Sequence, residues 1–140
     1  MSNLICCIFI FLLFIKSSIL FAGEDAVKNC ANIDFQTQGE MNDCATDNYH
    51  QWDVKLNSIY KKALEKYKSE DKKLLIIAER RWIAYRDAEC KFETADTEGG
   101  SVHGMVYVGC LAYYTEARIK DLEMQLNCEE GDMSCNTGNN

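Results

Sequence analysis

Residues 78–122 read AERRWIAYRDAECKFETADTEGGSVHGMVYVGCLAYYTEARIKDL, and they dictate the architecture of the chain. Apolar side chains recur at spacings of three and four on both sides of Gly99 and Gly100, which indicates two helices joined by a tight loop. Cys90 and Cys110 flank that loop, one in each helix. The segment therefore predicts a helical hairpin locked by a disulfide, which would hold the loop rigidly.

Three amphipathic helices are expected, because apolar residues follow helical spacing in three segments and no run alternates as a strand would. The stripes are Met41, Ala45, Tyr49, Trp52, Leu56, Ile59, Ala63 and Tyr67 in the first segment, Leu74, Ala78, Trp82, Tyr85, Glu89 and Phe92 in the second, and Val108, Leu111, Thr115, Arg118, Leu122 and Leu126 in the third. Thr37-Gln38-Gly39-Glu40 has the form of a capping box, and Ser69 is expected to cap the second helix.

The predicted fold class is an all-α, antiparallel bundle of three helices stapled by disulfides. The first helix would be about 45 Å long at 1.5 Å per residue, so a break near residues 43–48 and a four-helix bundle are an alternative. Residues 23–128 form the expected domain. Residues 129–140 are rich in Gly, Ser, Asn and acids, and are expected to be a flexible tail unless Cys128 and Cys135 pin them.

The first 22 residues are expected to be a secretory signal peptide. Residues 4–21 are almost wholly apolar and end at the small residues Ala22 and Gly23, which is typical of an export signal cleaved after Ala22. A retained membrane anchor is the alternative, given the length of the apolar run. No cysteine follows the small residues directly, which disfavours a lipoprotein. The expected location is the periplasm or the outside of the cell, without a membrane segment after cleavage.

The chain is acidic, with a formal net charge of −7. Loss of residues 1–22 would remove Lys16 and leave the remainder one unit more negative. This charge disfavours nucleic acid as a partner and favours a basic protein. The same charge could equally serve only to keep a small secreted protein soluble.

Six cysteines follow the expected cleavage point, an even number that indicates disulfides in an exported domain. Six cysteines allow 15 pairings. The favoured set closes short connections between neighbouring segments and consists of Cys30–Cys44, Cys90–Cys110 and Cys128–Cys135. Zinc is the rival interpretation, but no Cys-x-x-Cys pair or clustered histidines support it. Neither a metal nor a cofactor is therefore expected.

Charged residues on the helix faces are interpreted as architectural. Arg118 shares a face with apolar residues of the third helix, so it must either reach solvent or pair with a carboxylate. Arg86 and Asp87 lie beside Cys90 on the second helix. An interhelical polar network that fixes the register of the helices is expected from Asp53, Asn57, Arg86, Asp87 and Arg118.

No catalytic residue is expected, and the chain is predicted not to be an enzyme. His50 and His103 have no second histidine or acid at metal-ligand spacing. Glu40 with Asp43 or Asp47 could be read as the carboxylate pair of a glycosidase. Acids in the first turn of a helix are also what the helix dipole favours, and the sequence has no nucleophile elbow or phosphate-binding loop.

The glycine loop is the candidate binding site. It lies within residues 93–109, which are expected to join the second and third helices. Binding residues often lie on loops that a rigid scaffold supports, and glycine lets a partner approach the backbone closely. An equal alternative is a plain glycine turn in which Ser101 caps the third helix. A binding role would use Glu98, Gly99, Gly100, Ser101 and His103.

The order and spacing of these motifs resemble the LprI-like lysozyme-inhibitor family of small exported bacterial proteins. The first half of the resemblance rests on Cys30, Thr37-Gln38-x-Glu40-Met41-Asn42-x-Cys44-Ala45 and Asp53-x-x-Leu56-Asn57-x-x-Tyr60. The second half rests on Ala78-Glu79-Arg80-x-Trp82-Ile83-x-Tyr85-Arg86-Asp87-Ala88-Glu89-Cys90, Glu98-Gly99-Gly100-Ser101 and Cys110-Leu111-x-x-x-Thr115-x-x-Arg118-x-x-x-Leu122. The similarity spans residues 30–126. Cys128 and Cys135 lie beyond the shared pattern.

The resemblance implies a helical, disulfide-bonded domain of the periplasm or cell envelope that inhibits lysozyme and has no agreed catalytic residue. The leading hypothesis is an inhibitor that binds a basic, lysozyme-like cell-wall hydrolase and occludes its cleft, with residues 98–103 as the contact. The alternative is an envelope protein-interaction module, such as an immunity or accessory protein, whose partner is not lysozyme.

Overall fold

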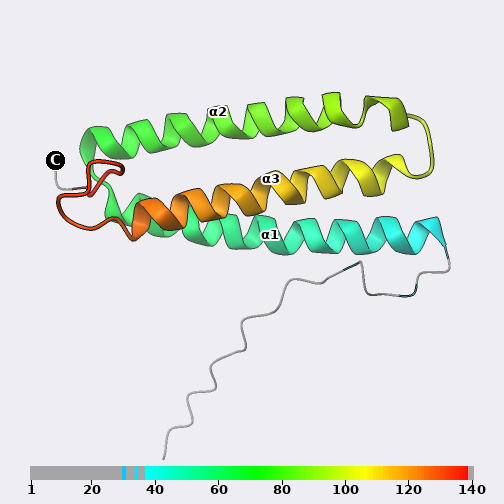
Figure 1. Cartoon of the computed structure of the whole chain (residues 1–140), viewed down its shortest axis with the longest axis horizontal. Helices are drawn as coiled ribbons and strands as arrows, with labels where there is room; N and C mark the ends of the chain where they lie inside the picture. The colour runs from blue at the N-terminus through cyan, green and yellow to red at the C-terminus, as the bar shows by residue number, and fades with distance from the viewer. Residues whose placement is uncertain (1–29, 31–33, 35–36, 139–140) are drawn as a thin grey trace, which may run out of the picture.

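The computed structural model describes Cys30, Asp34 and residues 37–138, and the expected signal peptide lies outside these residues. The elements in order are the helices α1 (Gln38–Lys66) and α2 (Ser69–Glu93), the 3-10 turn η2 (Ala95–Thr97) and the helix α3 (His103–Leu126). Consecutive helices run antiparallel, so α1 and α3 point in the same direction (Figure 1). The described part of the chain contains no strand, so the predicted all-α bundle of three helices is confirmed. None of its helices is both long and apolar enough to cross a bilayer.

The first helix, α1, is unbroken, so the four-helix alternative is wrong. It starts with the predicted capping box. Thr37 Oγ1 accepts a hydrogen bond from Glu40 N at 3.2 Å, and Glu40 Oε2 accepts one from Thr37 N at 2.9 Å. These bonds satisfy N–H groups that the first turn of a helix leaves without partners. One long helix thus runs the length of the bundle.

The serine cap expected at Ser69, and the one that the alternative reading of the loop placed at Ser101, are both wrong. Ser69 is the first residue of α2, and Lys68 occupies the cap position without a side-chain hydrogen bond. Only two residues separate α1 from α2, and Ser69 has a left-handed φ of 49° where the chain reverses. Val102, not Ser101, occupies the cap position of α3. The third helix begins at His103, so the α2–α3 connection is shorter than the sequence indicated.

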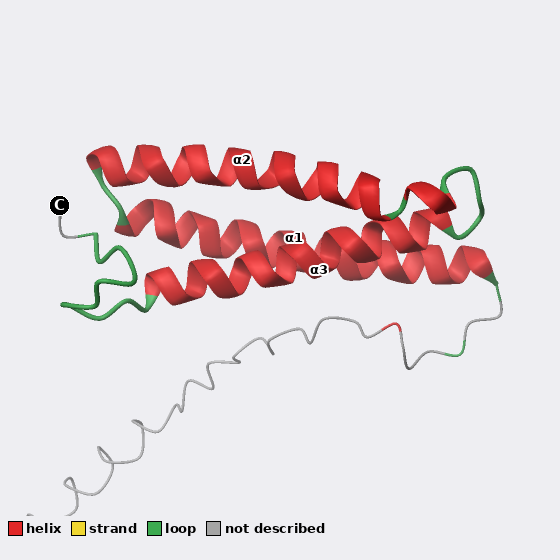
Figure 2. Ribbon diagram, turned by 45° about the horizontal axis from the view of Figure 1, so that its top comes forward, coloured by secondary structure: helices red, strands yellow, loops and turns green. Residues whose placement is uncertain are grey.

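Packing of α3 on α1 forms the core. Leu56 and Ile59 of α1 and Ile119 and Leu122 of α3 are buried together. Partly buried side chains cover this cluster, namely Trp52, Tyr60, Leu75, Trp82 and Leu126. The apolar stripes predicted for the first and third helices are therefore confirmed. The second helix, α2, stands further from this pair (Figure 2).

The inner face of α2 differs from the predicted one. Glu79 and Arg86 are buried, whereas Leu74, Tyr85 and Phe92 are 62%, 52% and 78% exposed. The prediction had the wrong rotation of the helix because it followed apolar spacing, whereas Glu79 and Arg86 occupy the inner face. In the structure Glu79 pairs with Arg118, and Arg86 pairs with Asp87. Glu79 and Arg86 thus take the inner positions that were expected for apolar residues of the stripe.

Side chains of α1 hold both ends of α3. At the start of α3, Asn42 Oδ1 accepts a hydrogen bond from Met105 N at 3.1 Å. At its end, Lys66 Nζ donates to the carbonyl oxygens of Gln125 and Leu126 at 3.0 and 3.1 Å. The terminal N–H and C=O groups of a helix have no partners within the helix, and a cation also complements the dipole at the C-terminus. The spacing of Asn42 and Lys66 on α1 thus fixes the register of α3.

The segment after α3 turns back onto the bundle. Cys128 forms a disulfide with Cys135. Tyr67 Oη donates to the carbonyl of Asn136 at 3.0 Å, and Asn136 N donates to Gln125 Oε1 at 3.0 Å. These bonds hold the segment that was expected to be a tail against the α1–α2 end of the molecule as far as Asn136.

Candidate protein-binding loop

Residues 94–102 connect α2 to α3 at the end of the bundle opposite the turn between α1 and α2 (Figure 1). Glu98, Gly99, Gly100 and Ser101 are exposed, and His103, the first residue of α3, is half-buried. The five candidate contact residues therefore lie together at one end of the molecule. Four of them are open to a partner.

Both glycines occupy positions that another residue would strain. Gly99 has a φ of 80°, in the left-handed region that glycine enters without a steric penalty. A Cβ atom on Gly100 would lie 3.1 Å from the carbonyl oxygen of Thr97. That oxygen also accepts a hydrogen bond from Gly100 N at 3.0 Å. The loop is therefore a defined tight turn.

Two threonines and a histidine hold the base of the loop. Thr94 Oγ1 donates to the carbonyl of Cys90, and Thr97 Oγ1 donates to that of Thr94, both at 2.7 Å. Thr97 Oγ1 lies 3.0 Å from Nδ1 of His103. Since the hydroxyl hydrogen is directed to Thr94, the ring nitrogen is the donor in this second bond. The His103 ring also stacks on Tyr107, so His103 supports the loop from inside.

Asn42 of α1 ties the loop to the bundle, a role that the sequence did not reveal. Its Nδ2 donates to the carbonyl of Ser101 at 3.2 Å, while its Oδ1 accepts from Met105 N at 3.1 Å. These partners lie 59 and 63 residues away along the chain. The sequence signal was only an amide two residues before Cys44, which is too weak to identify such distant partners.

Two disulfides strengthen the same end of the molecule. Cys90–Cys110 joins α2 to α3 one turn before the loop, with 5.7 Å between the Cα atoms. Cys30–Cys44 ties the N-terminal segment to α1. Together with Cys128–Cys135, these are the pairs that the sequence favoured. Three disulfides fit an oxidising compartment.

Arg86 joins all three helices below the loop. Its guanidinium donates to Asp87 Oδ1 at 2.9 and 2.8 Å and to Thr115 Oγ1 of α3 at 3.3 Å. It also lies 5.1 Å from the ring centroid of Trp82 and 5.7 Å from that of Tyr49 on α1. Burial raises the pKa of Tyr49, and the positive charge of Arg86 opposes that rise. Arg86 and Asp87 thus act in the architecture.

Arg118 of α3 pairs with Glu79 of α2. Its Nε and Nη2 donate to Glu79 Oε2 at 3.0 and 2.9 Å. Arg118 also lies 5.8 Å from the ring centroid of Trp82, so this indole contacts both guanidinium groups. Of the two alternatives that the sequence left for Arg118, solvent or a carboxylate, the structure shows the carboxylate, and Glu79 is the partner that the sequence did not identify.

The α1 members of the expected network bond to each other. Asn57 is exposed, and its Nδ2 donates to Asp53 Oδ2 at 3.0 Å and to the Asp53 carbonyl at 2.9 Å. Within the described residues, neither side chain forms a hydrogen bond across to α2 or α3. The predicted interhelical link through this pair is therefore wrong. Residues four apart on one helix lie side by side, so Asp53 and Asn57 bond to each other instead.

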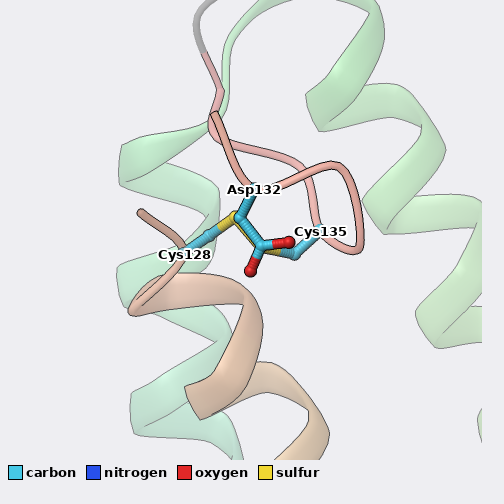
Figure 3. A group of neighbouring side chains, drawn as sticks. All are labelled: Cys128, Asp132 and Cys135. Carbon is cyan, nitrogen blue, oxygen red and sulfur yellow. A yellow bond between two sulfur atoms is a disulfide. The ribbon is translucent and has the colours of Figure 1, made fainter. Parts of the chain in front are cut away.

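Cys128, Asp132 and Cys135 bring two sulfurs and a carboxylate within 4.8 Å of one another (Figure 3). The two sulfurs are joined in a disulfide, so neither is a thiolate that could bind a metal. Asp132 Oδ1 accepts hydrogen bonds from Ser134 N at 2.8 Å and Ser134 Oγ at 2.7 Å, and these bonds lower the pKa of Asp132. Cys128, Asp132 and Cys135 therefore belong to a turn that a disulfide closes.

Similarity to known proteins agrees with this architecture. An uncharacterized protein of Rhizobium meliloti (strain 1021) is 31% identical over 107 residues, which cover 67% of this chain and 77% of that protein. No solved structure is significantly similar to the chain. The lysozyme inhibitor LprI family matches residues 30–122, a range that contains the glycine loop, Asn42 and both buried arginine sites. The chain belongs to the LprI lysozyme inhibitor family.

Proposed function

We propose that this protein is an exported inhibitor that binds a lysozyme-type cell-wall hydrolase in the periplasm or outside the cell. The observation that carries the proposal is family membership over residues 30–122. The three disulfides support it, since they suit an oxidising compartment. An inhibitor of this kind acts by binding to its partner and does not itself need to catalyse a reaction.

The glycine loop, residues 98–103, is the proposed contact. Its tip is exposed, and its base is held by the Cys90–Cys110 disulfide and by Asn42. A loop that is already ordered loses little conformational entropy when it binds, which favours affinity. Its position at a narrow end of the bundle suits entry into a concave cleft.

Charge supports a basic partner. The chain has a formal net charge of −7, and Asp96 and Glu98 place exposed carboxylates at the loop. Animal-type lysozymes are typically basic, so opposite charges would raise the rate of encounter. Inhibition should weaken as salt is added, because ions screen charges on exposed surfaces.

A lytic assay tests the proposal. Oxidised protein without residues 1–22 is added to lysozymes of several types acting on bacterial cell walls. We expect a dose-dependent loss of lysis with at least one type. Full lysis at excess protein with every type would contradict the proposed function.

Charge reversal tests the loop as the contact. Glu98→Lys should weaken inhibition about tenfold, since an interfacial charge contributes on the order of 1.4 kcal/mol. Glu130→Lys makes the same change on an exposed residue at the other end of the molecule and should alter inhibition less than about twofold. Equal losses in the two variants would show that net charge, rather than the loop, determines binding.

A further inference from the structure

A cavity of about 410 Å³ opens between α2 and α3 at the end opposite the glycine loop. Cavities of this size accommodate small organic ligands. Both helices line it with apolar side chains, and each helix adds one carboxylate, Asp71 from α2 and Asp121 from α3. The cavity thus offers an apolar surface and negative charge in one place.

Two of the large apolar side chains that line the cavity are largely exposed to solvent. Leu74 and Met124, on opposite walls, are 62% and 60% exposed, while Leu122 is buried beneath them. Large apolar side chains at such exposure, gathered around one cavity, indicate a binding surface. An alkyl chain laid between Leu74 and Met124 would remove both from water, which is favourable.

The two carboxylates of the cavity differ in exposure, because Asp121 is exposed and Asp71 is partly buried. Asp71 Oδ2 is buried and has no hydrogen-bond partner. In the described part of the chain, neither Asp71 nor Asp121 has an ion-pair partner. Arg118 also lines the cavity, but it is paired with Glu79 at 2.9 Å. A buried carboxylate oxygen without a hydrogen-bond donor is costly, so an ammonium group brought by a ligand would stabilise this site by donating to Asp71 Oδ2.

We propose that this cavity binds an amphipathic primary amine, with the ammonium group beside Asp71 and Asp121 and the alkyl chain on Leu74, Leu122 and Met124. From Asp71 to the end of α2, the helix extends about 33 Å at 1.5 Å per residue. The amine site is therefore separate from the loop, and it does not depend on the proposed inhibition of lysozyme.

Hexylamine is the probe, with hexanol and hexanoate as neutral and anionic compounds of equal chain length. Binding to the purified oxidised protein is followed by the methyl NMR signals of Leu74, Leu122 and Met124. We expect saturable shifts with hexylamine, binding at least about tenfold weaker with hexanol, and weaker still with hexanoate. Equal binding of all three compounds, or no saturation with hexylamine, would overturn the proposal.

Substitutions at the carboxylates locate the ammonium group. Asp71→Asn and Asp121→Asn should each weaken hexylamine binding about tenfold, since each removes one charge-assisted contact. Asp96→Asn removes an exposed acid at the loop end and should leave binding unchanged. Asp71 lies in the first turn of α2 and could also affect folding, whereas Asp121 lies inside α3. Unchanged binding in a folded Asp121→Asn variant would refute the site.

A lysine side chain carries the same chemistry as a free amine. Nα-acetyl-lysine methylamide in place of hexylamine distinguishes the two sources. Saturable binding that Asp121→Asn weakens would assign the cavity to a lysine of a partner protein. Binding of hexylamine alone would assign it to a free amine.

Discussion

Hydrogen bonds between distant parts of the chain hold both ends of the bundle, but the ends differ in how α2 meets α3: a disulfide joins the two helices at the loop end, and a cavity lies between them at the other end. At the loop end, covalent and hydrogen bonds join distant parts of the chain, through Cys90–Cys110 and Asn42. At the other end, the apolar cluster around Leu122 supplies the packing, and a cavity remains between α2 and α3. A disulfide and hydrogen bonds can hold a loop in one conformation without a large apolar core around it. The comparison teaches that α2 is bonded covalently to α3 where the chain presents its loop, and that open space lies between the same two helices at the other end.

Loss of the loop-end disulfide should have the largest effect. Removing it by Cys90→Ala with Cys110→Ala should cost about 3 kcal/mol in the free energy of unfolding, because the bond closes a loop with a sequence separation of 20. Urea unfolding measures the loss, and amide exchange should rise in residues 94–102.

The matched control removes Cys128–Cys135, whose sequence separation is 7. This double alanine variant should lose about 2 kcal/mol, since a shorter closed loop constrains the unfolded chain less. Amide exchange of the glycine loop should not change. If exchange there rose equally in both variants, the two ends would not be independent.

The buried ion pair between the helices should rank next. Glu79→Gln should cost about 2 kcal/mol, because it leaves the guanidinium of Arg118 largely buried without its counter-charge. Glu70→Gln removes the exposed pair with Lys73 and should change stability by less than about 0.5 kcal/mol. Both variants are compared by urea unfolding. Similar small losses would mean that solvent reaches Arg118 and that α2 is held by other contacts.

Asn42→Ala should loosen the loop at a smaller cost in stability, about 1 kcal/mol, because it removes the hydrogen bonds to Ser101 in the loop and to Met105 in α3. Amide exchange should increase at Met105 and in the loop but remain unchanged around Leu122. Asn57→Ala is the control, because Asn57 is exposed and bonds only within α1. Unchanged loop exchange in Asn42→Ala would leave the disulfide as the main support.

The sequence predicted the buried residues best in the helices whose buried residues are mainly apolar. The stripes of α1 and α3 consist mainly of apolar residues, and the structure buries them as expected. The disulfide pairs followed from short separations along the chain. Such features depend on local patterns, so a single sequence contains enough information to predict them.

The sequence failed where one residue's position depends on a distant partner. Glu79 is buried because it pairs with Arg118 of α3, which lies 39 residues away along the chain, and no local pattern encodes that partner. The same reason explains why the role of Asn42 in the candidate site was missed. The tight turn at Gly99 and Gly100, by contrast, follows from the paired glycines, and the sequence did predict it.

The turn between α1 and α2 offers the smallest and most specific test. Ser69 has a φ of 49°, which costs a residue with a Cβ about 1–2 kcal/mol. Glycine would relieve that strain but lose more backbone entropy on folding, by roughly 0.5–1 kcal/mol. Ser69→Gly should therefore stabilise the protein by about 0.5 kcal/mol, measured by urea unfolding. Ser58→Gly, at an exposed position inside α1, should destabilise it by a similar amount, because only the entropic term acts there. Two losses of equal size would mean that the reversal at Ser69 carries no strain, and that the turn end is as relaxed as a regular helix.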